Sequence, residues 1–135
     1  MNREILFRGK RIDNKEWVEG YYVPIANSLY LIYTDKFGIT RDGIYLDQIP
    51  VFSETVGRFT GLIDKNGRKI FEEDILKRGS HKYVVKWCDD CAMFVLPCIT
   101  DKKLESDFTV FYDYDFEIIG NVHDDPELLG GENNA

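Results

Sequence analysis

The sequence predicts a mainly β protein, built as a small curled barrel or as two small packed β-sheets, with a short helical turn near the C-terminus. Aromatic residues make up 14% of the chain, and aromatic and β-branched side chains favour strands. Short apolar runs are separated by turn signals roughly every eight to twelve residues, which is typical of sandwiches and barrels. No window shows a long apolar stripe at helical spacing.

The clearest local signal is a hairpin between residues 56 and 76. Asn66-Gly67 suits a tight turn, because both residues tolerate positive φ and the turn then twists with its flanking strands. Asp64 lies just before the turn, where its carboxylate can accept backbone N–H groups. Apolar runs at residues 59–63 and 70–71 supply the two strands. We therefore predict a hairpin with a polar tip here.

Four apolar runs of strand length precede this hairpin, at residues 5–7, 17–23, 29–33 and 44–46. Glycine and charged residues separate them, so we expect turns at residues 35–38 and 41–43, and we expect residues 8–11 to lie in or near a turn. Pro50 should end the fourth strand or place it at a sheet edge, because proline donates no ladder hydrogen bond.

Four further strands are expected after the hairpin, at residues 74–77, 83–87, 93–96 and 112–118. The last of these alternates aromatic and acidic residues, as a strand with one wet face does. Residues 101–106 are expected to form a loop. Asp125 and Pro126 predict the start of the short helical turn, as N-cap and first helical residue.

The length of 135 residues suits a single β-rich domain over residues 1–129, followed by a flexible tail at 130–135. Residues 48–53 are the weakest joint, so the domain can be divided into lobes at 1–50 and 51–129. We find neither a signal peptide nor an apolar run long enough to span a membrane. We therefore expect a soluble, cytoplasmic protein.

The net charge of −7 is distributed unevenly along the chain. Residues 104–135 contain nine acidic residues and no lysine or arginine, whereas the N-terminal end is basic and contains Trp17. A basic face with aromatic side chains can hold single-stranded nucleic acid, but the acidic quarter would repel phosphate. We expect a protein partner rather than nucleic acid, and no membrane partner; a homo-oligomer stays open.

One candidate for metal or redox chemistry is the pair Cys88 and Cys91, with Cys98 and His81 in the neighbourhood. Two cysteines at this spacing can bring both thiolates onto one metal ion. A full site needs further ligands, and the sequence offers only isolated ones. The alternative, which we favour, is a tight turn between two strands with Asp89 and Asp90 at its tip.

Two acidic clusters are weaker candidates. Glu72, Glu73 and Asp74 are adjacent carboxylates that could hold a divalent cation, but three consecutive residues cannot share one face of a strand. His123 beside Asp124 resembles a general base, yet no nucleophile motif accompanies it. We expect no catalytic residue, cofactor or metal site, and the metal candidates kept are Cys88, Cys91, Glu72 and Asp74.

Three segments together resemble the YopX family of phage and prophage proteins. They are residues 7–10 with 17–21, residues 59–76, and residues 117–129, which include Phe59-Thr60-Gly61-Leu62, Asp64-Lys65-Asn66-Gly67 and Asp74-Ile75-Leu76. The resemblance implies a small phage-encoded protein with a mainly β domain, located in the cytoplasm of the bacterial host. It implies no catalytic residues.

Three functions remain under consideration. The first, which we favour, is a non-catalytic binding or adaptor module. The second is an enzyme with a scattered site, metal-dependent around Glu72, Glu73 and Asp74. The third is an acidic decoy for a host factor, using Asp113, Asp115 and Glu117.

Overall fold

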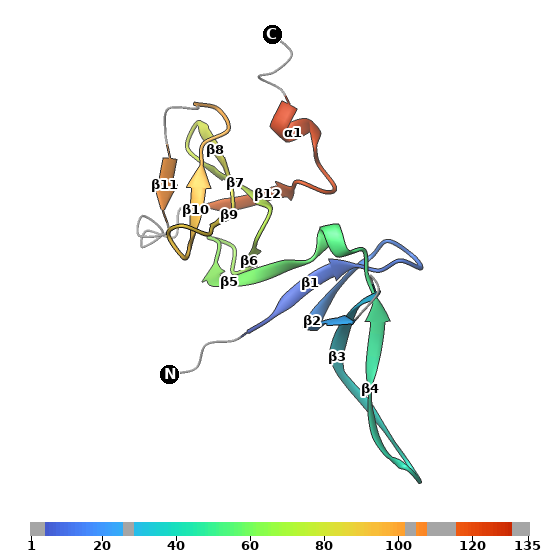
Figure 1. The fold of residues 1–135 in the computed structure, drawn as a ribbon. Coiled ribbons are helices and arrows are strands. Elements are labelled where there is room, and N and C mark those ends of the chain that lie inside the picture. The colour runs from blue at the N-terminus through green and yellow to red at the C-terminus, as the bar shows by residue number, and fades with distance from the viewer. Residues whose placement is uncertain (1–4, 26–28, 102–104, 108–115, 131–135) are drawn as a thin grey trace. The chain divides into compact units, whose positions relative to one another are not determined.

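A computed structural model describes residues 5–25, 29–101, 105–107 and 116–130 of the chain. The chain divides into two compact units, Met1–Phe59 and Thr60–Ala135 (Figure 1). The expected single domain with lobes at 1–50 and 51–129 stays a prediction. In the described residues, no helix has both the length and the apolar character needed to cross a membrane.

The strands of the first unit belong to a sheet in the order β4-β3-β2-β1-β5-β6, and the unit ends at Phe59 within β5. A 3₁₀ turn at Ser53–Thr55 joins β4 to β5, and the first residues of β5 pair with β1. The strands are β1 (Phe7–Lys10), β2 (Trp17–Ile25), β3 (Leu29–Thr40), β4 (Gly43–Pro50) and β5 (Gly57–Ile63). β4 ends at Pro50, as expected. The expected turn at residues 41–43 is also confirmed, because β3 ends at Thr40 and β4 begins at Gly43.

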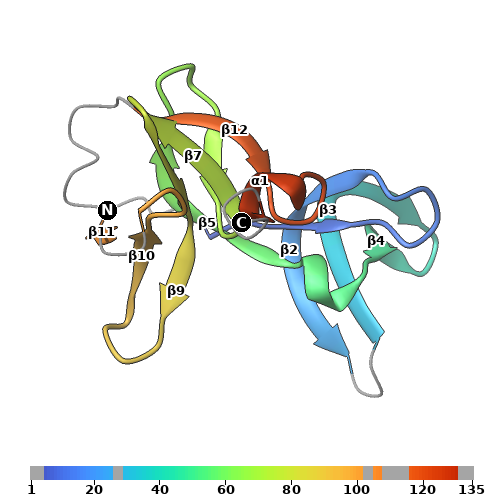
Figure 2. The same ribbon diagram turned by 90° about the horizontal axis from the view of Figure 1, so that it is seen from above.

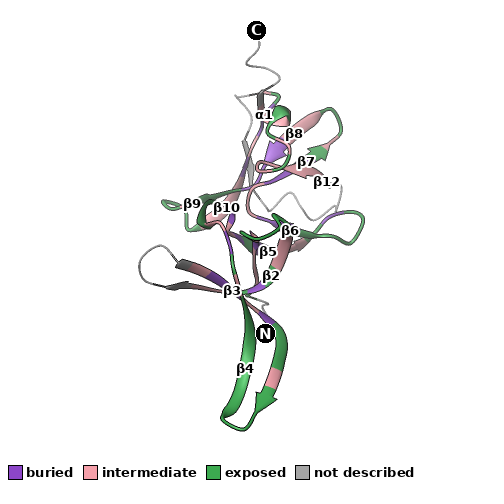
Figure 3. Cartoon of the chain, turned by 90° about the vertical axis from the view of Figure 1, so that its right-hand side faces the viewer, coloured by how far each residue is buried: buried purple, intermediate pink, exposed green. Residues whose placement is uncertain are grey.

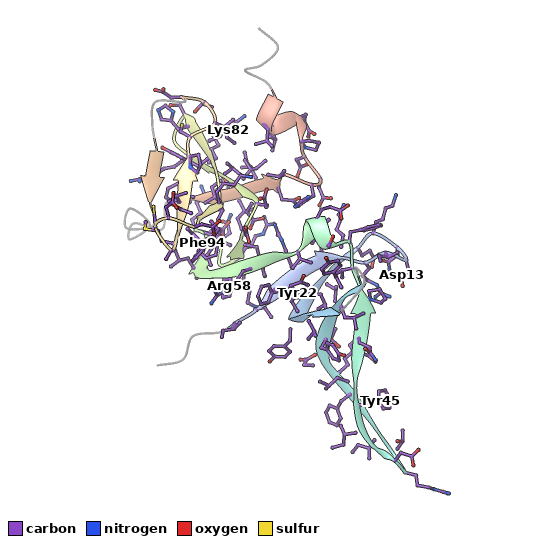
Figure 4. All side chains as sticks on the ribbon, viewed as in Figure 1. Asp13, Tyr22, Tyr45, Arg58, Lys82 and Phe94 are labelled. Carbon is purple, nitrogen blue, oxygen red and sulfur yellow. The ribbon has the colours of Figure 1, made fainter. Side chains whose placement is uncertain are left out.

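Val51, just after β4, links two other parts of the first unit. It bridges Arg11 on one side, and its N–H donates to the Tyr30 carbonyl at 3.0 Å on the other. Val51 and Ile32 are almost fully buried. Tyr22 stacks against Tyr30 at a centroid distance of 6.2 Å. Figure 4 labels Tyr22 on this sheet.

The turn expected at residues 35–38 is wrong, since they lie in β3, whereas residues 8–11 lie near a turn as expected, because β1 ends at Lys10 and a turn follows at residues 12–14. The glycines of these two strands serve close approach. A Cβ at Gly9 would lie 3.1 Å from the Val51 Cβ, so a side chain there would crowd Val51 and require it to shift by a few tenths of an ångström. A Cβ at Gly38 would overlap the Tyr45 ring, which covers that stretch of β3. Glycine permits both a turn and a close contact between chain segments. Which of the two occurs at Gly9 and Gly38 depends on residues elsewhere in the chain, Val51 and Tyr45.

The second unit contains two three-stranded sheets, in the orders β12-β7-β8 and β11-β10-β9, and the hairpin of β5 with β6. Figure 2 shows β9 and β10 as a hairpin of their own. The elements are β6 (Lys69–Phe71), β7 (Asp74–Arg78), β8 (His81–Val84), β9 (Lys86–Cys88), β10 (Met93–Pro97), β11 (Glu105–Asp107), β12 (Glu117–Asn121) and α1 (Glu127–Gly130).

Most sequence expectations for the second unit are confirmed. The β7, β10 and α1 segments lie where expected. Residues 83–87 form two strands rather than one, and Glu105–Asp107 is a strand where a loop was expected. The alternating run at 112–118 is described only from Phe116 onward, so most of it lies outside the described residues.

The main core lies in the second unit. Its buried members come from five strands and the segments beside them: Ile70, Leu76, Tyr83, Val85, Leu96, Cys98, Phe116 and Ile118. A smaller cluster of Ile75, Val84 and Ile99 is covered by Leu128 and Leu129 of α1. The prediction of a mainly β protein is confirmed. The two predicted architectures were a curled barrel and packed small sheets, and the described strands form small antiparallel sheets and no closed barrel.

Asp64 ties the β5–β6 turn to β12. Its Oδ1 accepts the N–H groups of Asn66 and Arg68, each at 2.9 Å. Its Oδ2 accepts the N–H of Ile118 at 3.0 Å, across 54 positions of sequence. The side chain is only 2% exposed, so these bonds replace almost all of its hydration. The expected role of Asp64 in accepting N–H groups of the turn is confirmed. Its bond to Ile118 also attaches the turn to a strand that is distant in sequence.

Replacing Asp64 by asparagine should therefore destabilise the protein. The substitution removes the charge and turns one acceptor oxygen into an amide that opposes an N–H donor. We expect a loss of about 2–3 kcal/mol in the free energy of unfolding, measured by urea denaturation. Asp89→Asn, at the exposed tip of the β9–β10 turn, is the control. An Asp64→Asn loss no larger than the control loss would contradict this role.

Asp64 should also make stability depend on pH. Burial alone raises the pKa of this carboxyl, but the N–H donors of Ile118, Arg68 and Asn66 and the Arg68 charge outweigh it, so the folded pKa is lowered. The stabilisation is complete above the ordinary aspartate pKa of about 3.9 and is lost as pH falls through the lowered folded value. The stability gap between the native protein and Asp64→Asn should close in that range, as acid titration of urea midpoints would measure. A gap independent of pH would contradict this linkage.

Candidate functional site

The cysteine pair lies at the turn between β9 and β10. Cys88 ends β9, and residues 89–92 form the turn, so the tight-turn interpretation is confirmed. The two sulfur atoms are 2.6 Å apart, and the N–H of Cys91 donates to the Cys88 sulfur at 3.2 Å. Neither cysteine is in a disulfide, and Cys91 is exposed.

Cys98 and His81 form a separate contact. Cys98 belongs to the buried core, and its sulfur lies 3.8 Å from Nδ1 of His81 and 3.3 Å from the hydroxyl of Thr100. His81 Nδ1 also lies 3.0 Å from that hydroxyl. Within the described part of the chain, no three His, Cys, Asp or Glu side chains form a group that could hold a metal ion.

The acidic run at residues 72–74 is divided among different partners. Asp74 is buried, and its Oδ2 accepts the N–H of Phe71 at 2.7 Å. Glu73 has a φ of 75° and forms an ion pair with Lys86 at 3.2 Å. These contacts close the β6–β7 turn and attach it to β9. The carboxylates of Glu73 and Asp74 thus serve the fold, and Glu72 is half-buried beside them.

Asn121 organises the turn that holds His123. Its side-chain oxygen accepts the N–H groups of His123 and Asp124, each at 2.9 Å. The carboxylate of Asp125 accepts the N–H of Asn121 at 3.1 Å. Of the three proposed decoy residues, Asp113 and Asp115 lie outside the described residues. Glu117 is described, and it forms an ion pair with Lys65 at 3.6 Å.

The sequence interpretation missed a group of exposed apolar residues on the β3–β4 hairpin. Phe37 lies opposite Leu46, and Ile39 lies opposite Ile44. Residues opposite one another share a face of a sheet, as do residues two apart, so these four side chains form one patch. Their exposed fractions are 62% for Phe37, 73% for Ile39, 71% for Ile44 and 42% for Leu46. We call this patch the apolar quartet and residues 37–46 the arm.

The two faces of the arm differ. Tyr45 lies opposite Gly38 and covers its backbone on the face away from the quartet (Figure 4). The register shifts between Tyr33 and Phe37, so residues 34–36 lie opposite Asp47 alone. Such a bulge re-aims the strand beyond it. Thr34 is buried at the bulge, where its hydroxyl accepts the N–H of Lys36 at 3.2 Å.

Figure 3 shows that exposed residues continue along β4 and the end of β3. The signal that could have revealed this patch is the alternation of apolar residues at 37, 39, 44 and 46 around the turn at 41–43. Gly38 hid the alternation, because a glycine among charged residues usually indicates a turn. A large exposed apolar patch is itself a functional indication, since monomeric proteins rarely expose one.

The fold and these sites define a small two-unit β protein with an exposed apolar arm. A sequence model of the YopX protein family matches residues 6–130, and the chain belongs to that family. A crystal structure of protein EF1440 from Enterococcus faecalis is similar, with a TM-score of 0.57 and 24% sequence identity. The match covers 95% of this chain and 99% of that one, and it supports the fold. No curated protein matches the chain.

The geometry of the cysteine pair predicts selective oxidation. On treatment with a small-molecule disulfide, Cys88 and Cys91 should form a bond with each other and lose two hydrogen atoms, while the probe is reduced to two thiols. Buried Cys98 should stay reduced. Mass spectrometry of the intact protein and its peptides would measure this.

Cys91→Ser is the control for that experiment, and it should carry a stable mixed adduct on Cys88 because no neighbouring thiol remains to displace the probe. Stable mixed adducts on both cysteines of the native protein would contradict the predicted pairing.

Proposed function

We propose that this protein is a non-catalytic binding module that docks a protein partner through the apolar quartet of the arm. The observation that carries the proposal is the exposure of Phe37, Ile39, Ile44 and Leu46 on one face of a paired hairpin. Membership of the YopX family supports a bacterial cytoplasmic setting of phage or prophage origin, which is part of the proposal.

The exposed quartet is a source of binding energy. Burying a large aliphatic or aromatic side chain contributes about 1.5–3 kcal/mol relative to leaving it exposed. Four such side chains that are about half to three quarters exposed can therefore contribute several kcal/mol to docking a partner. That contribution must exceed the entropy lost on association. The quartet meets this condition better than scattered exposed residues do, because its members adjoin.

The arm is preorganised for docking. Its two strands are paired from Phe37 opposite Leu46 to Thr40 opposite Gly43. The Thr40 hydroxyl donates to the Gly43 carbonyl at 3.2 Å near the turn. The same hydroxyl accepts the N–H of Asp42, also at 3.2 Å. Tyr45 packs over Gly38 on the opposite face. A surface already held in its binding geometry loses less entropy when it binds.

The surroundings of Trp17 support a protein partner over nucleic acid. A base-stacking surface needs an open aromatic face. Here the Arg8 guanidinium lies 4.5 Å from the Trp17 ring centre, and the Lys10 ammonium lies 5.6 Å from it. Both cations make cation–π contacts with the Trp17 ring, so a nucleic-acid base would have to displace them in order to stack there. The net charge of −7 opposes phosphate as well.

Removing the quartet's isoleucines should abolish partner capture. Immobilised native protein should retain a specific protein from a lysate of prophage-bearing bacteria, quantified by mass spectrometry. The double variant Ile39→Ser/Ile44→Ser should retain at least about tenfold less, because a loss of 1.4 kcal/mol already corresponds to tenfold. Both side chains are exposed, so folding should be unchanged.

Ile12→Ser is the matched control for the capture experiment, since Ile12 is also exposed but lies outside the arm. It should capture as the native protein does. Equal recovery by native and arm variants, or no reproducible recovery at all, would count against the proposal.

A further inference from the structure

We propose that the turn between β9 and β10 binds a monovalent copper ion through three sulfur atoms, those of Cys88, Cys91 and Met93. The site is independent of the arm, because the two lie in different units of the chain. Two observations carry the proposal: the sulfurs of the two cysteines converge, and a methionine lies directly opposite one of them.

The third sulfur comes from the pairing of the hairpin. Cys88 is the last residue of β9, and Met93, the first residue of β10, is its partner across the two strands. Directly opposite residues share a face of a sheet, with Cβ atoms about 4.5–5.5 Å apart. The unbranched, flexible side chain of methionine spans such a gap. The thioether of Met93 is therefore within reach of the Cys88 sulfur, and it adds a ligand type outside the His, Cys, Asp and Glu set considered above.

The face of the hairpin that carries these sulfurs lies away from the core. The neighbouring pair, Trp87 and Phe94, lies on the opposite face, because side chains alternate along a strand. Phe94 packs against the main core, and its ring meets the Trp87 ring at a centroid distance of 5.0 Å. This contact fixes the register in which Cys88 faces Met93. Figure 2 shows the turn at the free end of the hairpin, where exposed Cys91 lets an ion enter from solvent.

The backbone of the turn supports ligation by thiolates. The N–H of Cys91 that donates to the Cys88 sulfur at 3.2 Å orients this sulfur and stabilises the negative charge that it carries as a ligand. Ala92 has a φ of 54°, a left-handed conformation that helps to turn backbone N–H groups toward one side. Two sulfurs on one ion lie roughly 3.7–4 Å apart, so the present pair must separate slightly. Rotation of the exposed Cys91 side chain provides that separation.

The ligand set selects monovalent copper. Thiolates and thioethers are soft ligands, and copper in its monovalent state is a soft ion that prefers them. Structural zinc takes four ligands in a tetrahedron, from Cys, His and carboxylates. Monovalent copper binds stably in linear or trigonal sulfur sites, so it needs no fourth ligand. The exposed carboxylates of Asp89 and Asp90 surround the tip with negative charge, which favours a cation there.

The experiment is a competition for copper, in the absence of oxygen, between the reduced full chain and bicinchoninate, a chelator that is coloured when it holds monovalent copper. The native protein should remove one copper ion per chain and bleach the colour. Binding releases the two thiol protons to solvent, and no electron is transferred. Native protein oxidised to the Cys88–Cys91 disulfide should remove none, because no thiolate remains, and this comparison needs no variant.

Two variants test the ligands individually. Met93→Leu keeps the size of the side chain and removes its sulfur. It should lower the copper affinity at least about tenfold, the lower end of what the loss of even an outer-shell partner costs a metal site. Cys91→Ser should lower the affinity further. Cys98→Ala is the matched control, because this thiol lies in the main core, and it should bind copper as the native chain does. Circular dichroism would check that each variant is folded.

Several results would overturn the proposal. One is a reduced native chain that removes no copper, and another is a Met93→Leu variant that competes as well as the native chain. A ratio of one copper ion to two chains would place the site between copies instead of within one turn. Zinc is the second probe, and a chain that retains zinc against a chelator but takes no copper would contradict the choice of metal.

Discussion

The carboxylate of Asp64 is the interaction on which the second unit depends most. A buried charge is tolerated only where hydrogen bonds replace its hydration, and Asp64 obtains three from backbone N–H groups. Two of these close a local turn, while the third reaches Ile118 in β12. Beside it, the Lys65 N–H donates to the Phe116 carbonyl at 2.9 Å. One side chain thus links a hairpin that forms locally to a strand that must arrive from far along the chain.

This explains why the family signature around residues 59–76 contains little that suggests chemistry. Asp64 satisfies backbone donors, and Gly67 adopts a φ of 82°, which L side chains rarely adopt. Ile70 and Leu76 are fully buried in the main core. Asp74 accepts the N–H of Phe71 in the following turn. These residues have folding roles, so an interaction surface is better sought in residues that the core does not use.

The sequence was sufficient where neighbouring residues determine the structure. Asn66-Gly67 and Pro50 act through their own backbone preferences, so the hairpin and the end of β4 could be predicted. The arm could not, because Gly38 is conformationally ambiguous and its role depends on Tyr45, across the hairpin. The register shift before Phe37 is also invisible in the pattern. The exposed quartet is therefore recognised only after the pairing of β3 and β4 is known.

The central claim is that the arm is the surface through which this protein docks a protein partner. Methyl NMR of protein labelled at isoleucine δ1 positions tests it most directly, by following chemical shifts as the partner recovered from the lysate is added. We expect the Ile39 and Ile44 methyl signals to shift on addition, while those of buried Ile70 and Ile75 stay fixed. Unchanged Ile39 and Ile44 signals at saturating partner, or equal shifts for all isoleucines, would contradict the claim.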